Sequence, residues 1–240
     1  GKALNWFGGT SNASTQLLDG MHYRGLVRIA RREGGVRLYA AREPHPPAPD
    51  PAAALDAMVD RVVAKYAPLP ERSLGELVHH LRYGVPQWAD RRRDALARAK
   101  QRLPFARAEG VNWYWPAGEN PASMRHAAPE RVRLLAPFDP VVWDRRRFEA
   151  FWGWAYRFEA YTPAPKRVRG YYALPLLWRD QVIGWGNLAL APDGRLHAEL
   201  GYVKGRPPRE RGFRAALDDE LAGVETFLQP RAAAAPGRAA

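Results

Sequence analysis

The chain has 240 residues, which is enough for one large domain or two small ones, and it contains no cysteine. Its hydrophobic fraction of 46% is typical of a globular protein. The lack of cysteine excludes disulfides, cysteine-liganded zinc and thiol nucleophiles. No apolar run approaches the roughly 18 residues of a membrane-spanning helix and no signal peptide is present, so the sequence predicts a cytoplasmic protein.

The formal net charge of +12 favours a polyanionic partner, either nucleic acid or an anionic membrane surface. The alternative is a GC-rich coding bias that inflates Arg, Ala and Pro together, and the tail Pro230–Ala240 fits that pattern. A clear positive excess remains when this tail and Arg206–Arg211 are left out. The charge therefore favours nucleic acid over a membrane.

Residues 1–43 are predicted to form the second half of a winged helix-turn-helix. A helix is expected after Ser11 or Asn12, either of which can cap it, and a hairpin should follow with its turn at Gly34-Gly35. Six Lys/Arg against two acidic residues in the first 40 positions fit contact with phosphates. The alternative is a helix–hairpin piece of an ordinary α+β domain. The helix is expected to bury an apolar stripe made of Ala13, Leu17, Leu18 and Met21. The two strands of the hairpin are expected at Leu26–Ala30 and Val36–Ala40.

The start of the chain bears on this interpretation. It begins with Gly1-Lys2 rather than Met, and its first residues already have the pattern of the middle of a folded unit. We therefore expect the chain to be the C-terminal part of a longer protein, with the first half of this winged helix upstream of Gly1.

A proline-rich linker at Glu43–Pro51 precedes a second unit, residues 52–118, which is predicted to be a complete winged helix. The order of its expected elements is helix, helix, basic helix and hairpin. Ser73 is expected to cap the second helix, with Glu76 at the capping-box position. The residues predicted to face inward are Leu55, Met58, Val59, Val62 and Val63 on the first helix and Leu74, Leu77, Val78 and Leu81 on the second. The basic helix is expected at Trp88–Arg102, and the hairpin at Phe105–Trp115 with its turn at Glu109-Gly110.

The third unit, residues 131–228, is predicted to be a β-barrel-like module with a terminal helix, and residues 229–240 a disordered tail. Its helical segments are expected at Arg145–Phe158 and Arg209–Leu228. Asp193-Gly194 is a strong hairpin signal between two of its strands. The expected strands are Tyr171–Trp178, Gln181–Leu190 and Leu196–Val203. The whole chain is thus predicted to be α+β, with tandem winged helix-turn-helix units, a small antiparallel β-barrel or sheet, and a C-terminal helix.

The stretch Leu134–Leu190 holds 13 of the 27 aromatic residues, with eight Lys/Arg against five Asp/Glu. Such a pattern fits a packed core whose indole and phenol groups need polar partners. It also fits a nucleic-acid face, where arginines contact phosphates and aromatic rings stack on bases. Composition alone favours the core.

The sequence offers few groups for catalysis. The histidines are scattered and no phosphate-binding glycine loop or nucleophile elbow is present, so neither a metal nor a cofactor is expected. Asp139 and Asp144 could act in acid–base chemistry. Each has a structural alternative: an Asx-turn for Asp139, and a helix cap or an ion pair with an arginine for Asp144.

Several longer motifs resemble the bacterial crosslink-repair DNA glycosylases of the YcaQ/AlkZ type, and YcaQ more than AlkZ. The resemblance runs from about Trp6 to Val203. It is carried by Leu135-Ala136-Pro137-Phe138-Asp139-Pro140, Trp143-Asp144-Arg145-Arg146-Arg147-Phe148, Tyr156-Arg157-Phe158-Glu159-Ala160-Tyr161-Thr162-Pro163, Lys166-Arg167, Gly170-Tyr171-Tyr172-Ala173-Leu174-Pro175, and Met21-His22-Tyr23-Arg24-Gly25 with Ser11-Asn12-Ala13.

The resemblance implies tandem winged helices followed by a β-barrel, and a monofunctional enzyme that hydrolyses the N-glycosidic bond of alkylated or crosslinked purines. The implied partner is double-stranded DNA with such bases, and we expect a monomer associated with the nucleoid. Family members use a Gln-x-Gln or Gln-x-Asp pair to activate water, and none of Gln16, Gln87, Gln101 and Gln181 starts such a motif. No catalytic residue is therefore expected in this chain.

The remaining expectation is a set of DNA contacts. A non-enzymatic winged-helix regulator, or a structural fold whose charge reflects genome composition, are the alternatives to the DNA-holding part of a glycosylase. The expected DNA contacts are Ser11, Asn12, Thr15, His22, Tyr23, Arg24, Arg91, Arg92, Arg93, Arg145, Arg146, Arg147, Lys166 and Arg167.

Overall fold

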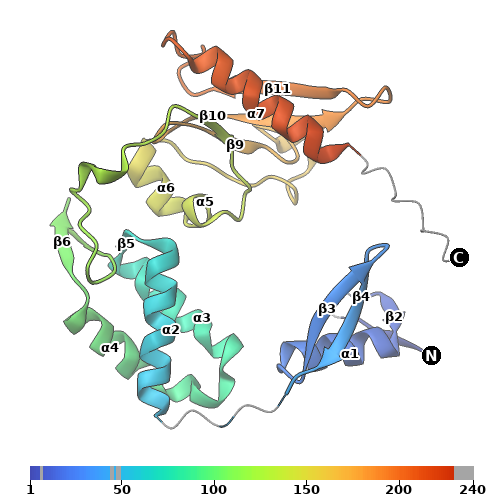
Figure 1. Cartoon of the computed structure of the whole chain (residues 1–240), viewed down its shortest axis with the longest axis vertical. Helices are drawn as coiled ribbons and strands as arrows, with labels where there is room; N and C mark the ends of the chain where they lie inside the picture. Colours follow the sequence, from blue (N-terminus) through green and yellow to red (C-terminus); the bar gives the residue numbers. More distant parts are fainter. Residues whose placement is uncertain (6–7, 44–45, 47–49, 230–240) are drawn as a thin grey trace, which may run out of the picture. The chain divides into compact units, whose positions relative to one another are not determined.

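The computed structural model describes residues 1–5, 8–43, 46 and 50–229 (Figure 1). The chain divides into two compact units, with the boundary between Ala117 and Gly118. Part of the predicted linker Glu43–Pro51 and the tail from residue 230 lie outside the described residues. No helix in the described part of the chain has the length and apolar character needed to cross a membrane.

The first unit begins with a small helix-and-hairpin assembly. Its strands β1 (Lys2–Leu4) and β2 (Thr10–Asn12) pair antiparallel, and helix α1 (Ala13–Tyr23) follows directly. Strands β3 (Val27–Glu33) and β4 (Val36–Ala41) then form the predicted hairpin. Gly34 and Gly35 have φ values of 52° and 82°, so the turn uses the left-handed conformations that glycine tolerates best.

Two expectations for helix α1 were wrong. Asn12 stands at the N-cap position, but its side chain accepts no capping hydrogen bond. Ser11 Oγ accepts a hydrogen bond from the side-chain Nε2 of Gln16 at 3.0 Å, which is not a bond to a helix amide. The predicted buried stripe is not buried, since no residue of α1 is buried and Leu17 is 65% exposed. Helical spacing identified the helix correctly, but its apolar face is only partly covered: Leu18 and Met21 are half-buried, whereas Ala13 and Leu17 are exposed.

The rest of the first unit packs three helices against a small sheet. The helices are α2 (Pro51–Tyr66), α3 (Glu71–Gly84) and α4 (Arg92–Arg102), with a 3-10 segment, η1 (Pro86–Arg91), before α4. The sheet has the order β5-β7-β6, formed by β5 (Leu69–Pro70), β6 (Phe105–Ala108) and β7 (Val111–Tyr114). The core is built from side chains predicted to face inward, among them Leu55, Val59, Val63, Leu74 and Val78.

The predicted cap of α3 was wrong, and the predicted hairpin after α4 was confirmed. Helix α3 begins at Glu71, so Ser73 lies inside the helix and is buried, and no capping box with Glu76 forms. Glu109 and Gly110 take φ values of 51° and 78° in the β6–β7 turn. A glycine in a two-residue turn is therefore a better signal than a serine before a helix.

The second unit contains one antiparallel sheet of four strands, in the order β11-β10-β9-β8. The strands are β8 (Val132–Leu134), β9 (Leu174–Trp178), β10 (Gln181–Leu190) and β11 (Leu196–Tyr202). Among the described residues β8 and β11 do not pair with each other, so the sheet is open. Of the two predicted alternatives, the antiparallel sheet is confirmed and the closed barrel is wrong. The helical elements are η2 (Met124–His126), α5 (Pro140–Trp143), α6 (Arg145–Trp152), η3 (Ala164–Lys166) and α7 (Phe213–Leu228).

Helix α6 is shorter than predicted. It ends at Trp152 because Gly153 adopts a left-handed φ of 71° and donates its N–H to the carbonyl of Glu149 at 2.8 Å. The expected helix to Phe158 is therefore wrong, and residues 153–158 form irregular chain. The C-terminal helix was predicted correctly except that it begins at Phe213, after Gly212.

Two cores lie on the two faces of this sheet. One places Phe213 and Leu217 of α7 against Val132, Leu176 and Trp178. The other joins Val142, Phe148, Trp154, Tyr156 and Val182, with Leu177 beside them. Consecutive residues of β9 therefore serve opposite cores, as the two-residue period of a strand requires, and Figure 1 shows α7 and the α5–α6 pair on opposite sides of the strands.

Candidate nucleic-acid interface

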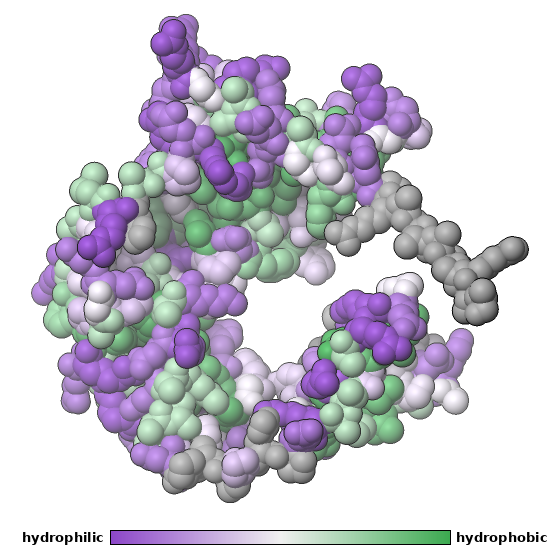
Figure 2. Space-filling model, viewed as in Figure 1, coloured by the Kyte–Doolittle hydropathy of each residue, from purple (hydrophilic) through white to green (hydrophobic). Residues whose placement is uncertain are grey.

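The β3–β4 hairpin carries four arginines, and the free end of the hairpin is covered by hydrophilic side chains (Figure 2). Arg31 pairs with Glu33 at 2.6 Å, and Arg37 pairs with Asp19 of α1 at 2.7 Å. Arg28 and Arg32 are exposed and make no hydrogen bond or ion pair with other described residues. These two guanidinium groups are thus free to meet phosphates.

Asp19 fixes the hairpin to α1. Its carboxylate accepts hydrogen bonds from Tyr39 Oη and Arg37 Nη1, both at 2.7 Å. The hydrogen bond from Tyr39, followed by the charge of Arg37, lowers the pKa of Asp19 below its ordinary value. One turn earlier in the helix, Gln16 Nε2 donates to the carbonyls of Ala3 and Leu4 at 3.0 and 2.7 Å. Helix α1 is thereby held between the two hairpins.

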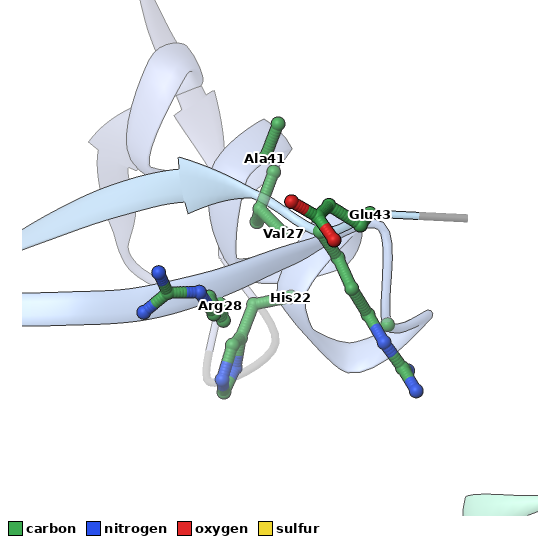
Figure 3. Close-up of a pocket in the computed structure, with 7 residues that line it drawn as sticks. His22, Val27, Arg28, Ala41 and Glu43 are labelled. Carbon is green, nitrogen blue, oxygen red and sulfur yellow. The ribbon is translucent and has the colours of Figure 1, made fainter. Parts of the chain in front are cut away.

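A hollow of about 610 Å³ lies where α1 ends and the hairpin begins (Figure 3). His22, Arg28 and Arg42 line it, and Glu43 is the acidic residue among its lining. Figure 3 shows the His22 and Arg28 side chains among those that line it. The hollow therefore combines one predicted contact, His22, with two arginines outside the predicted set.

The other predicted contacts on α1 differ in how free they are. Asn12, Thr15, Tyr23 and Arg24 are exposed, with Tyr23 66% exposed, whereas Ser11 is half-buried and engaged by Gln16. Thr15 and His22 lie seven positions apart and so share one face of the helix, and Asn12 at the N-cap precedes Thr15 by three positions.

Much of the basic charge of α4 is used inside the first unit. Arg98 makes a bidentate pair with Asp56, with both distances 2.8 Å, Lys100 pairs with Glu71 at 2.5 Å, and Arg102 pairs with Asp60. The hydrogen bond from Lys100, followed by its charge, lowers the pKa of Glu71. These contacts join α4 to α2 and α3. The basic composition of this helix therefore overstates the charge available to a ligand.

The predicted trio at the start of α4 separates into two kinds. Arg92 donates to the carbonyls of Ala89 and His79, the latter at 3.1 Å, and so fastens the end of η1. Arg91 and Arg93 are exposed and form no hydrogen bond or ion pair within the described chain. Only these two remain free for an external anion.

The second predicted trio, at the start of α6, also separates. Arg147 is 3% exposed and donates to the carbonyl of Pro140, so it supports the α5–α6 corner from inside and we leave it out of the interface. Arg145 lies over the Tyr156 ring at 4.7 Å. Arg146 is exposed. The sequence could not distinguish the three because helix geometry turns consecutive residues to different sides.

Asp139 and Asp144 are helix caps. Asp139 Oδ1 accepts from Val141 N at 2.8 Å, and Asp144 Oδ1 accepts from Arg146 N and Arg147 N, both at 3.1 Å. These bonds satisfy amides that the first turns of α5 and α6 leave unpaired. The structural alternative for each aspartate is confirmed.

A buried carboxylate organises the loop that carries Lys166 and Arg167. Glu159 is 5% exposed, and its Oε2 accepts from the backbone N–H of Val168, Arg169 and Gly170 at 2.9, 2.8 and 3.3 Å. Burial by itself would raise the pKa of Glu159, but these three hydrogen bonds outweigh it and hold the pKa below its ordinary value. The loop is therefore held from inside by one anion.

The loop displays two of the predicted contacts. Lys166 is exposed, while Arg167 donates from Nε to the Thr162 carbonyl at 2.8 Å and lies over the Tyr171 ring at 4.9 Å. Arg169, which sequence reasoning missed, lies over both Trp154 and Trp185, at 5.1 and 5.3 Å. The sequence feature that could have indicated Arg169 is the interleaving of arginines with aromatic residues in Leu134–Leu190. In the structure this pattern contains both core residues and surface residues.

Exposed basic groups on several elements are a feature of nucleic-acid-binding proteins. Comparison with protein-family models identifies the family: residues 2–227 match the family described as DNA glycosylase AlkZ-like. The chain belongs to this family of DNA glycosylases, and the resemblance seen in its motifs is confirmed. No solved structure gives a significant match to the chain.

Proposed function

We propose that this chain is the DNA-holding portion of a glycosylase that hydrolyses the N-glycosidic bond of alkylated or interstrand-crosslinked purines in duplex DNA. The observation that carries the proposal is the family match over residues 2–227. It is supported by exposed cationic groups that have no ion-pair partner among the described residues, namely Arg28, Arg32, Arg91, Arg93, Arg146 and Lys166.

We further propose that both halves of the first unit are winged helix-turn-helix elements. The order α2, β5, α3, α4, β6, β7, with the sheet order β5-β7-β6, is the arrangement expected of a complete unit. Helix α4 would then be the recognition helix, and Arg91 and Arg93 stand at its N-terminal end. In the first half, α1 and the β3–β4 hairpin would take the roles of recognition helix and wing.

We propose that this chain binds DNA without releasing bases by itself. No glutamine in it is followed two positions later by glutamine or aspartate, which is the pair that the family resemblance implies for water activation. Asp139 and Asp144 are engaged as helix caps. An assay that detects abasic-site formation on an oligonucleotide with an alkylated purine should give no product with this chain, and product formation would overturn this part of the proposal.

Duplex binding is tested by fluorescence anisotropy with a labelled oligonucleotide between 50 and 200 mM salt. Six to ten phosphate contacts predict roughly a 10³- to 10⁵-fold loss of affinity over this range. Combined substitution of Arg28, Arg32 and Arg146 by Ala should weaken binding and flatten the salt dependence by about three phosphate contacts, that is by a slope of roughly 2.7.

A control variant distinguishes the loss of a positive charge in general from the loss of an arginine in the proposed interface. Arg214→Ala on α7 removes an exposed arginine that pairs with Asp218 and is not in the proposed interface. This variant should leave the salt dependence unchanged. If it weakened binding as much as any one interface arginine, the attraction would be a general charge effect. Strong preference for one undamaged sequence would favour the non-enzymatic regulator.

A further inference from the structure

A pocket of about 410 Å³ lies at one end of the sheet in the second unit, within the range of roughly 300–1,000 Å³ that is usual for small-ligand sites. Its lining combines the end of α6, the two strands on either side of the β9–β10 turn, and the segment Val203–Glu210 that follows β11. Three tryptophans contribute to the lining: Trp152, Trp154 and Trp178.

The donors of all three indoles are already used inside the protein. Trp152 Nε1 donates to the Asp180 carbonyl at 2.9 Å, Trp154 Nε1 to the Val182 carbonyl at 2.8 Å, and Trp178 Nε1 to Glu210 Oε2 at 2.8 Å. The rings are therefore fixed in orientation, and what they offer a ligand is apolar ring surface. Trp154 and Trp178 are buried, at 9% and 3% exposure, while Trp152 is half-buried and is therefore the most exposed of the three.

The remaining charged lining is basic. Lys204, Arg206 and Arg209 belong to the pocket, are exposed, and make no hydrogen bond or ion pair with other described residues. The acidic residue of the lining, Glu210, is bound by Trp178 and lies 3.3 Å from Arg179 Nη1, so its charge is compensated. An aromatic pocket with this charge disfavours a cationic ligand, which such rings otherwise bind, and favours an anion that carries a flat apolar group.

We propose that this pocket binds an unpaired nucleotide of the DNA substrate, with the base against Trp152 and the phosphate on Lys204, Arg206 and Arg209. A nucleotide combines a flat aromatic ring with an adjacent negative charge, and proteins that bind single strands join aromatic platforms to basic grooves in this way. The proposal rests on the proposed DNA-binding function. It adds a site for one extruded or single-stranded nucleotide, and the lining of this site includes none of the proposed duplex contacts.

The test measures binding of the full chain to oligothymidylate of eight nucleotides, by quenching of tryptophan fluorescence and by anisotropy. Trp152→Ala should weaken this binding about 5- to 150-fold, as expected for the loss of one base-stacking contact, while Trp152→Phe should restore much of it. Because Trp152 also packs on Phe148, with ring centroids 4.7 Å apart, a melting curve accompanies each variant.

A second, surface-only variant avoids any loss of folding. Reversal of Lys204, Arg206 and Arg209 to Glu should abolish oligothymidylate binding, whereas the same reversal at Arg195, Arg211 and Arg214, also in the second unit but outside the pocket, should weaken it far less. Equal losses in the two triple variants would overturn the proposal, because they would show a diffuse charge effect.

Two further ligands separate the base from the phosphate. An oligonucleotide of the same length with abasic residues should bind more weakly and should be insensitive to Trp152→Ala. If it binds as tightly as oligothymidylate, or if heparin binding depends on Trp152 to the same degree, the pocket does not recognise a base. The Arg28, Arg32 and Arg146 substitutions should weaken duplex binding and leave oligothymidylate binding intact, so failure of the duplex interface and failure of this site give different results.

Discussion

Glu159→Gln tests whether one buried carboxylate holds the loop that displays Lys166 and Arg167. The amide of Gln keeps the size of the side chain and one acceptor oxygen but removes the negative charge. Three backbone N–H groups converge on Oε2 at 2.8 to 3.3 Å. Hydrogen bonds to charged groups contribute about 1.5–3 kcal/mol each against about 0.5–1.5 kcal/mol for neutral ones.

The expected loss for Glu159→Gln is about 1–3 kcal/mol, less than the sum of three bonds because bonds to one oxygen are not additive. Glu159→Ala removes the acceptor altogether and should cost more. The measurement is urea unfolding followed by tryptophan fluorescence. Hydrogen exchange adds a local readout, since the amides of Val168, Arg169 and Gly170 should lose protection in both variants before the rest of the unit does.

The effect should depend on pH in a defined direction. The pKa of Glu159 is lower in the folded protein than its ordinary value, so its contribution is fully present above the unfolded pKa of about 4.3 and is lost as pH falls through the folded pKa. The difference in unfolding free energy between wild type and Glu159→Gln should therefore shrink between pH 5 and the acid range. A difference that stays constant down to about pH 3 would refute the reasoning.

Two further substitutions test the caps and the sheet. Asp144→Ala should destabilise the protein by about 1 kcal/mol in urea unfolding, because it removes the acceptor for two amides at the start of α6. Asp144→Asn should restore most of this stability without changing DNA binding. Reduced DNA affinity in the folded Asn variant would indicate a role beyond capping. Gly184→Ala should prevent stable folding of the second unit, seen as loss of its cooperative transition, because a Cβ there would collide with the backbone carbonyl oxygen of Gly201 on the neighbouring strand. Gly223→Ala on helix α7 is the control, because a Cβ at this position would meet no atom within 4 Å. This variant should be more stable than the wild type by about 0.5–1 kcal/mol. A loss of stability here as well would show that the assay responds to any glycine replacement.

The sequence was most informative where local chemistry alone decides the structure. The turns at Gly34-Gly35 and Glu109-Gly110 were located because few residues tolerate a left-handed backbone, and the α2 helix because its apolar residues recur at helical spacing. Helix α6 was extended too far because Gly153 was treated as an interior residue, although a glycine at that point is also a signal for a helix end.

Long-range pairing and burial were not accessible in the same way. Strand β8 has only three residues and is defined by its partner β9, so no local pattern identified it, and whether the sheet closes depends on its two edge strands. The candidate contacts show the same limit. Arg147 is buried and Arg146 exposed, yet as neighbours in a run of three arginines they look alike in the sequence.

The alternation along β9 has a consequence for how the second unit unfolds. Leu176 and Trp178 belong to the core beneath α7, whereas Leu177 packs with the core beneath α6. Separation of β9 from its neighbouring strands would expose apolar surface of both cores at once. Neither core can remain packed without the β9 side chains that belong to it. The two layers are therefore coupled through a single backbone, and the unit should melt in one cooperative transition rather than one layer at a time.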